Sequence, residues 1–208
     1  MKRFAYFAAF ALLAAIPLGA QAPQGWLLRT DRSTSASDPD AAGAVKFMAM
    51  GAGFHAITPQ AAVFWNPANR ATGNYTLKGN FTLVKPSDHT NYYGLVFGGS
   101  DLEGPKQTYI YFLVAQDGSF LIKQRVGDVN TNDVARAVHA AVRKPDAKGT
   151  SSNALEVRVV ADKIDYVVNG TVVHSTPRSG ATARTDGIYG IRSNHRLEVQ
   201  VSGLAVTK

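Results

Sequence analysis

The feature that most constrains this chain is a succession of short apolar runs, from Phe47 to near its last residue, that turn residues separate. Pairs such as Asn66-Pro67, Pro86-Ser87 and Gly98-Gly99 stand between these runs. Short runs bounded by such turn signals are typical of a β-sandwich or barrel, not of alternating strands and helices. We therefore expect an all-β fold.

The expected strands share a high content of Val, Ile, Phe and Tyr and polar or glycine-containing boundaries. They cover residues 46–50, 54–58, 61–65, 74–84, 92–97, 107–115, 119–126, 154–160, 164–168, 171–175, 187–192 and 196–206.

Residues 127–153 have few strand signals, although so long a structureless stretch is unusual inside a compact domain. Thr131 or Asn132 could cap a short helix with Val134 and Val138 on one face. Alternatively, residues 140–144 form one more short strand. Both alternatives remain open at the level of sequence.

Residues 1–22 have the composition of a secretory signal peptide. Lys2 and Arg3 precede an apolar run, and Ala20-Gln21-Ala22 supplies the small residues that a signal peptidase requires. The apolar run is shorter than the ~20 residues of a membrane-spanning helix. We expect cleavage after Ala22, a secreted or periplasmic protein, and no membrane attachment after cleavage.

The rest of the chain is long enough for one β-sandwich domain. Residues 23–45 are rich in Ser, Asp, Ala and Gly and are predicted to form a flexible N-terminal arm. Trp26 could attach the start of this arm to the sandwich domain, which covers residues 46–208. The absence of cysteine excludes disulfides and thiolate metal sites, so stability must come from the apolar core.

The net charge of +7 falls to +5 when Lys2 and Arg3 are removed with the signal peptide. The remaining basic residues are scattered singly, whereas a nucleic-acid-binding protein gathers them on one face. We therefore expect no nucleic-acid partner.

The first predicted hairpin covers residues 109–125. A two-residue turn at Asp117-Gly118 would mix charged and apolar side chains on one face. A three-residue loop that begins at Gln116 instead pairs Val114 with Phe120 and gives one wholly apolar face. The other face then carries Tyr109, Tyr111, Leu113, Leu121, Lys123 and Arg125.

The second predicted hairpin has Asn169-Gly170 at its tip, the pair that favours a two-residue turn with both residues at positive φ. This register places Asp165 opposite His174. We interpret the two as a surface pair and not as catalytic residues, because no nucleophile accompanies them.

Several segments together resemble the concanavalin A-like lectin/glucanase superfamily, in particular laminin-G-like and 3-keto-disaccharide hydrolase-like domains. They are Tyr93-Gly94-Leu95-Val96-Phe97, residues 109–112, Asp117-Gly118-Ser119-Phe120, Asn153-Ala154-Leu155-Glu156-Val157, Tyr166-Val167-Val168-Asn169-Gly170 and Gly187-Ile188-Tyr189-Gly190-Ile191. The resemblance covers residues 46–208. It implies a jelly-roll sandwich of two antiparallel sheets, one of them concave, and a function in sugar binding or glycoside hydrolysis.

The chain departs from the hydrolytic members in two ways. Its glutamates, Glu103, Glu156 and Glu198, are isolated, so the Glu-x-Asp-x-x-Glu motif of the family glucanases is missing. It also has Asn91-Tyr92-Tyr93-Gly94 where the 3-keto-disaccharide hydrolase-like domains carry Gly-Asn-Ser-Gly.

Whether the protein is an enzyme is left open by the sequence. A glycoside hydrolase would need two carboxyl groups on either side of the bond, and the candidates are Asp88, Asp101, Glu103 and Asp165. A further alternative is a structural or interaction module of the cell envelope.

Our leading hypothesis is a non-catalytic domain that binds carbohydrate, or another small amphipathic ligand, on its concave sheet. The predicted ligand-binding residues are Tyr109, Tyr111, Lys123 and Arg125, because aromatic rings accept the faces of sugar rings and basic groups bind hydroxyls or acidic substituents. We expect this set to face outward.

We expect neither a metal nor a cofactor. The histidines at positions 55, 89, 139, 174 and 195 show no metal-ligand spacing. The acidic and amide residues at positions 128–133 lack the glycine and the terminal glutamate of an EF-hand loop.

Overall fold

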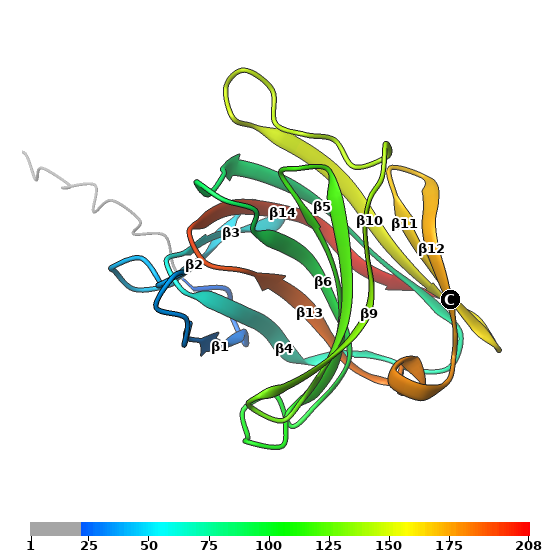
Figure 1. Cartoon of the computed structure of the whole chain (residues 1–208). Coiled ribbons are helices and arrows are strands. Elements are labelled where there is room, and N and C mark those ends of the chain that lie inside the picture. Colours follow the sequence, from blue (N-terminus) through cyan, green and yellow to red (C-terminus); the bar gives the residue numbers. More distant parts are fainter. Residues whose placement is uncertain (1–21) are drawn as a thin grey trace, which may run out of the picture.

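The fold, a two-layer β-sandwich, is described by a computed structural model over residues 22–208 (Figure 1). The predicted signal peptide lies outside these residues, apart from Ala22. Each layer is a seven-stranded antiparallel sheet, which confirms the expected all-β jelly-roll class. Within residues 22–208, no helix is long and apolar enough to cross a membrane.

The first sheet, here called the concave sheet, has the strand order β1-β4-β13-β6-β7-β8-β9. The bounds of its strands are β1 Leu27–Asp31, β4 Ala61–Ala71, β13 Gly187–Ser193, β6 Tyr92–Ser100, β7 Thr108–Ala115, β8 Ser119–Val126 and β9 Asn130–Val138.

The second sheet, here called the back sheet, has the order β12-β11-β10-β5-β14-β3-β2. Its strands are β12 Thr171–Pro177, β11 Lys163–Val168, β10 Ser151–Val159, β5 Tyr75–Lys85, β14 Leu197–Thr207, β3 Gly53–Thr58 and β2 Lys46–Met50. A single turn of 3₁₀ helix, η1 Gly180–Thr182, links β12 toward β13.

The main core lies between the two sheets, because side chains alternate in direction along each strand and the apolar ones share the inner face. In β5 the buried residues Leu77, Phe81 and Leu83 alternate with more exposed neighbours. They meet Phe112 and Tyr166 in one cluster. Strand β7 differs, since it is buried on both faces, which means that the outer face of the concave sheet is covered as well.

The predicted register of the first hairpin is confirmed. Val114 pairs with Phe120 and Phe112 with Ile122. Gly118 has φ 86°, the left-handed conformation that the three-residue loop requires. The apolar stripe of this hairpin therefore faces the main core, as its side-chain pattern indicates.

The predicted register of the second hairpin is wrong by one residue beyond Val172. Asn169 does have a positive φ, but a β-bulge lies between Tyr166 and Val167. It shifts the pairing so that Asp165 lies opposite Ser175, whose hydroxyl donates to Asp165 at 2.6 Å, and His174 lies opposite Tyr166. An extra residue in one strand shifts every later pair by one position. Here the extra residue is Val173, which follows another valine, so the sequence has no local signal for the bulge.

Both alternatives for residues 127–153 are wrong. The segment forms β9 from Asn130 to Val138, an extended edge strand paired with β8, and residues 139–150 form turns and loop. Its side chains are mostly exposed and polar, so it lacks the apolar alternation by which strands are found in a sequence.

Part of the segment predicted to be a flexible arm also belongs to the sheet. Residues Leu27–Asp31 pair with Ala61–Trp65 of β4 as an edge strand. The ring of Trp26 lies 4.4 Å from that of Phe54 and 5.3 Å from that of Phe47, as the expected attachment requires.

The concave sheet is strongly curved (Figure 1). Five strand spacings separate β1 from β8, which in a flat sheet would be roughly 24 Å. Nevertheless Asp31 of β1 lies 2.8 Å from the guanidinium of Arg125 on β8. The two edges of the sheet therefore approach one another over its outer face, and this face is the concave one.

Candidate functional site

The concave face carries a second apolar cluster that is separate from the main core. It consists of Val63, Trp65, Tyr92, Val96, Leu102, Tyr109, Tyr111, Leu113, Ala115, Leu121 and Ile188. The hairpin register places the four predicted ligand-binding residues on this face, with Tyr109 opposite Arg125 and Tyr111 opposite Lys123.

The expectation that these four side chains face solvent is wrong for three of them. Tyr109 is 1% exposed, Tyr111 is 6% exposed and Arg125 is 9% exposed. Lys123 is partly exposed and lines a hollow at the surface. The predicted face is correct, but the side-chain pattern along one hairpin contains no information on the residues from distant strands that cover the tyrosines.

One of these covering residues is Asp31, which holds two buried guanidinium groups. Its carboxylate bonds Arg125 at 2.8 Å and also accepts a hydrogen bond from Arg192. Arg192 in turn donates to the phenol oxygen of Tyr109 at 2.9 Å and lies 5.3 Å above the ring of Tyr111. Two of the four predicted residues thus belong to a packed network, and Tyr111 lies against it.

The electrostatics of this network follow from its composition. Burial alone would raise the pKa of Asp31, but Arg192 and Arg125 outweigh it and hold the pKa below its usual range. Burial would lower the pKa of Arg192, because it disfavours the charged form, but Tyr109 and Asp31 outweigh this effect and raise the pKa above its usual value. Burial likewise raises the pKa of Tyr111. All three acid–base groups therefore keep fixed protonation states near neutral pH.

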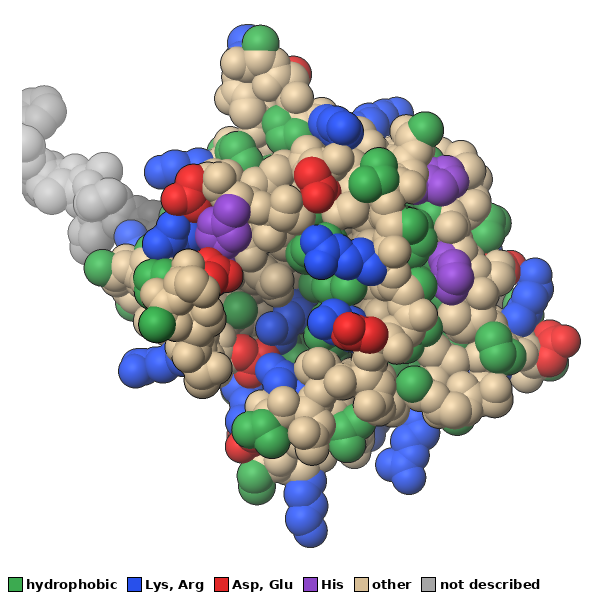
Figure 2. Space-filling model, in the orientation of Figure 1, with side chains coloured by type: hydrophobic (Ala, Val, Ile, Leu, Met, Phe, Trp, Pro, Cys, Tyr) green, Lys and Arg blue, Asp and Glu red, His purple; other side chains and the backbone are tan. Residues whose placement is uncertain are grey.

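The part of the concave face that remains open is a cleft beside this network, and charged side chains gather around it (Figure 2). One hollow, of about 530 Å³, is bounded by β6, β8, β9 and the segment after β1. Its lining includes Thr90, Asn91, Tyr92, Leu121, Lys123, Asp133, Arg136 and Asn194. A second hollow of about 170 Å³ continues from it toward Asp31 and Arg192, and both share Asp38, Asn91 and Asn194.

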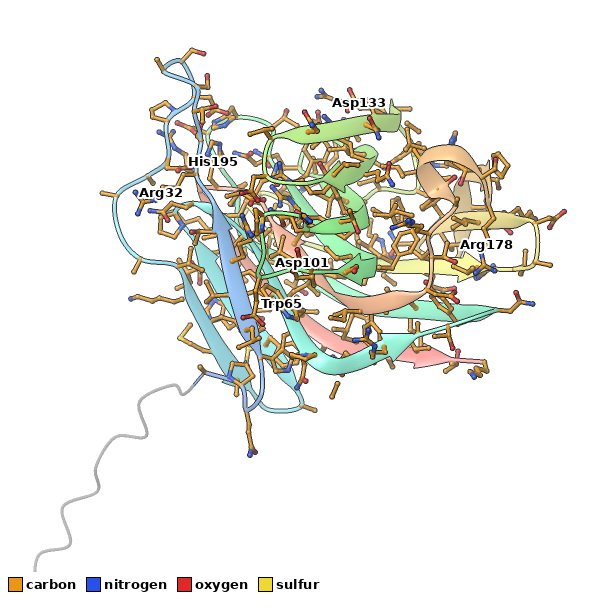
Figure 3. All side chains as sticks on the ribbon, turned by 90° about the horizontal axis from the view of Figure 1, so that it is seen from below. Arg32, Trp65, Asp101, Asp133, Arg178 and His195 are labelled. Atoms are coloured by element: carbon orange, nitrogen blue, oxygen red, sulfur yellow. The ribbon has the colours of Figure 1, made fainter. Side chains whose placement is uncertain are left out.

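The groups in the cleft combine an aromatic ring with hydrogen-bonding side chains. The guanidinium of Arg136 lies 5.4 Å from the centre of the Tyr92 ring. Lys123 bonds Asp133 at 2.7 Å, and Asp133 is exposed on β9 at the rim (Figure 3). Because Tyr92 is 5% exposed, such a lining binds a polar molecule mainly by hydrogen bonds from its charged and amide groups.

Arg136 is one of the residues of this site that sequence reasoning missed. It lies on β9, the strand that has no apolar alternation, and it pairs with Leu121. Among residues 22–208 no carboxylate lies within ion-pair distance of its guanidinium. Only recognition of residues 130–138 as a strand could have placed Arg136 on the concave face.

The carboxylates considered for glycoside hydrolysis lie apart. Asp88 and Asp101 flank opposite ends of β6, and Asp165 is on β11 of the back sheet. Asp101 and Glu103 share one loop, in which Asp101 has a positive φ of 51°. Burial is slight at Asp88, where hydrogen bonds from His89 and Arg196 lower the pKa to about 2. No two of these three separated positions face one another across the cleft.

A larger hollow, of about 600 Å³, lies outside the concave face. Residues on β3, β14 and the loop after β5 line it, among them Ile57, Pro59, Pro86 and Leu197. It is shallow, and its lining is mainly apolar. It contains none of the predicted ligand-binding residues.

Comparison of the chain with known proteins gives likeness in structure but not in sequence. No protein-family model matches the chain, and no curated protein sequence matches it. The carbohydrate-binding module CBM66 from Bacillus subtilis is similar in structure with a TM-score of 0.62 and 10% identity, covering 88% of this chain and 96% of that one.

Two further solved structures have the same arrangement. A protein of unknown function with a galectin-like fold from Bacillus subtilis has a TM-score of 0.59 and 13% identity, covering 87% of this chain and 88% of that one. The potassium-bound carbohydrate recognition domain of Emp46p has a TM-score of 0.56 and 11% identity, with 88% of each chain covered. At these identities the likeness concerns the fold alone, a two-sheet jelly-roll sandwich of the expected class.

Proposed function

We propose that the protein binds carbohydrate in the cleft of its concave sheet and does not catalyse a reaction there. The observation that carries the proposal is the open cleft of about 530 Å³ in which Lys123 and Arg136 stand beside the ring of Tyr92. Two of the structurally similar proteins are a carbohydrate-binding module and a carbohydrate recognition domain by name, which supports this reading.

In this proposal the residues of the site have two kinds of role. Lys123 and Arg136 donate hydrogen bonds to ring hydroxyls or to acidic substituents, and the amide of Asn194 provides both a donor and an acceptor. Tyr109, Tyr111 and Arg125 are positioning residues, since they are buried behind the cleft and keep the sheet curved around it. We further propose that the protein acts outside the cytoplasm, where cell-wall and plant polysaccharides are found, after removal of residues 1–22.

The test is calorimetric titration of the purified protein against neutral and acidic polysaccharides. We expect binding that weakens at least about tenfold in Arg136→Ala and in Lys123→Ala, a loss of about 1.4 kcal/mol or more. Lys163→Ala is a matched control, because Lys163 also pairs with an aspartate, Asp165 at 2.9 Å, but on the back sheet. Absence of binding to any polysaccharide class, or an equal loss in the control, would contradict the proposal.

A further inference from the structure

Three loops at one end of the sandwich bring two imidazoles and a carboxylate to one point. His89 lies between β5 and β6, His195 between β13 and β14, and Asp38 in the segment after β1. Nε2 of His89 is 3.2 Å from Nε2 of His195 and 2.9 Å from Oδ1 of Asp38. Nε2 of His195 is 3.2 Å from the same oxygen, and Figure 3 places His195 beside the segment that follows β1.

The outer nitrogen of each imidazole has a carboxylate partner of its own. Nδ1 of His195 is 3.1 Å from Oδ1 of Asp40, and Nδ1 of His89 is 2.8 Å from Oδ1 of Asp88. When each Nδ1 donates its hydrogen to the carboxylate that it faces, the Nε2 lone pair of the same ring is free to bind a cation.

In that tautomer both Nε2 lone pairs point at the shared site, and Asp38 adds a charged oxygen. Three electron-pair donors then converge on one point. Without a cation, Nε2 of His89 has the amide of Asn91 as its donor at 3.0 Å, and water can reach the partly exposed His89 and Asp38. A single hydrogen on either Nε2, donated to Asp38, also satisfies the cluster, so a metal ion would take the place of this hydrogen.

The spacing of the three donor atoms fits a small metal ion. Ligand atoms about 2.1 Å from a common ion, at angles between 90° and the tetrahedral value, lie roughly 3.0 to 3.4 Å apart. The observed separations of 2.9, 3.2 and 3.2 Å match this range closely. In protein metal centres, a histidine ligand usually donates its other ring N–H to a carboxylate, and Asp40 and Asp88 are placed to accept these hydrogen bonds.

We propose that Asp38, His89 and His195 bind one divalent transition-metal ion of the zinc class. Two imidazole nitrogens select such an ion over Ca²⁺ and Mg²⁺, which prefer oxygen ligands. Asn91 has its amide 3.0 Å from Nε2 of His89, so a half-turn of this amide offers an oxygen as the fourth ligand. The proposal replaces the expectation of no metal, which rested on spacing along the sequence.

The ion would connect parts of the chain that the core leaves unconnected. Asp38 and Asp40 belong to a loop segment without strand pairing, whereas His195 is buried between two long strands. Asp38 also lines both hollows of the concave cleft. Metal binding therefore fixes one wall of the cleft, although the site itself does not depend on what the cleft binds.

The test is titration of the metal-free protein, purified without a histidine tag, with Zn²⁺ in competition with a chromophoric chelator. We expect one ion per chain. His89→Ala and His195→Ala should each weaken the affinity about a hundredfold or more, and Asp40→Asn by the 10- to 100-fold typical of a second-layer partner. His174→Ala, which removes an imidazole near Tyr166, is the matched control and should bind as the wild type does.

Co²⁺ provides a second readout that does not depend on stability. Its visible absorption should show nitrogen and oxygen ligands in the wild type and in His174→Ala, and this spectrum should be lost in His89→Ala. Failure to bind Zn²⁺ and Co²⁺, binding that survives both histidine variants, or displacement of Zn²⁺ by an equal concentration of Ca²⁺ would each overturn the proposal. Sugar titrations of the same His89→Ala protein separate this result from the fate of the proposed carbohydrate site.

Discussion

Arg192 donates a hydrogen bond across 2.9 Å to the phenol oxygen of Tyr109, a residue 83 positions earlier in the chain. The same guanidinium binds Asp31, which also holds Arg125. A single carboxylate thus balances two buried cations on the concave face.

Asp31→Asn should destabilise the protein by about 3–5 kcal/mol, because it leaves two buried guanidinium groups without a counter-charge. Urea unfolding followed by fluorescence measures the loss. Asp133→Asn is the control: its side chain is 78% exposed, so breaking its pair with Lys123 should cost less than about 1 kcal/mol. Similar losses in the two variants would contradict the account of the buried network.

The stability should also depend on pH in a way that Asp31 determines. Its pKa in the folded protein is lowered, whereas the unfolded chain has the ordinary value of about 3.9. The carboxylate therefore stabilises the fold above that value, and this contribution is lost as the pH falls through the lower, folded pKa. Unfolding curves between pH 6 and pH 2 should converge for the wild type and Asp31→Asn on the acid side. A difference that stays constant over this range would contradict the prediction.

Gly190→Ala should destabilise the concave sheet. Gly190 lies at a β-bulge in β13, between β4 and β6, where an added Cβ would collide with the carbonyl oxygen of Phe64. Overpacking of this kind costs about 1–3 kcal/mol, because the neighbouring strand must move. Gly73→Ala meets no atom within 4 Å, so it should cost only the strain of its positive φ, about 1 kcal/mol. Thermal unfolding of both variants provides the comparison.

Trp26→Ala should loosen the attachment of β1. The ring of Trp26 packs on Phe47 and Phe54, and its removal should lower the unfolding free energy by about 2–3 kcal/mol. Trypsin should then cut faster at Arg29 and Arg32. Leu28→Ala serves as the control, since Leu28 is 45% exposed and its loss should change stability by less than about 0.5 kcal/mol. Unchanged cleavage in Trp26→Ala would show that the strand is held by its pairing with β4 alone.

The elements that could be predicted from the sequence are those that bury one face. The pairing of Val114 with Phe120 follows from side-chain pattern, because a slip by one residue would place lysine in the core. Strands β1 and β9 cannot be found in this way, because few of their side chains are buried and neither strand shows a regular alternation of apolar and polar residues. The bulge before Val167 is equally hidden.

The two candidate sites, on the concave face and at His89 and His195, were even less predictable from the sequence than the edge strands. The four residues predicted for ligand binding do share one face, but the burial of Tyr109, Tyr111 and Arg125 depends on Asp31 and Arg192, which come from β1 and β13. His89 and His195 are 106 positions apart in the sequence, and their loops come together only because of the order in which the strands are arranged in the sheets. Spacing along a chain detects ligand pairs within one element, and it carries no information on three loops that meet at the end of a sandwich.

The contact between Asp31 and Arg192 spans 161 positions, nearly the whole length of the described chain. Contacts between residues so far apart form slowly, because the entropy cost of closing the loop is incurred before the contact stabilises the chain. Strand β1 can pair with β4 before β13 is in place, but Asp31 cannot bind Arg192 until β13 has joined the sheet. We therefore expect the cover over Tyr109 to form later than the pairing of β1.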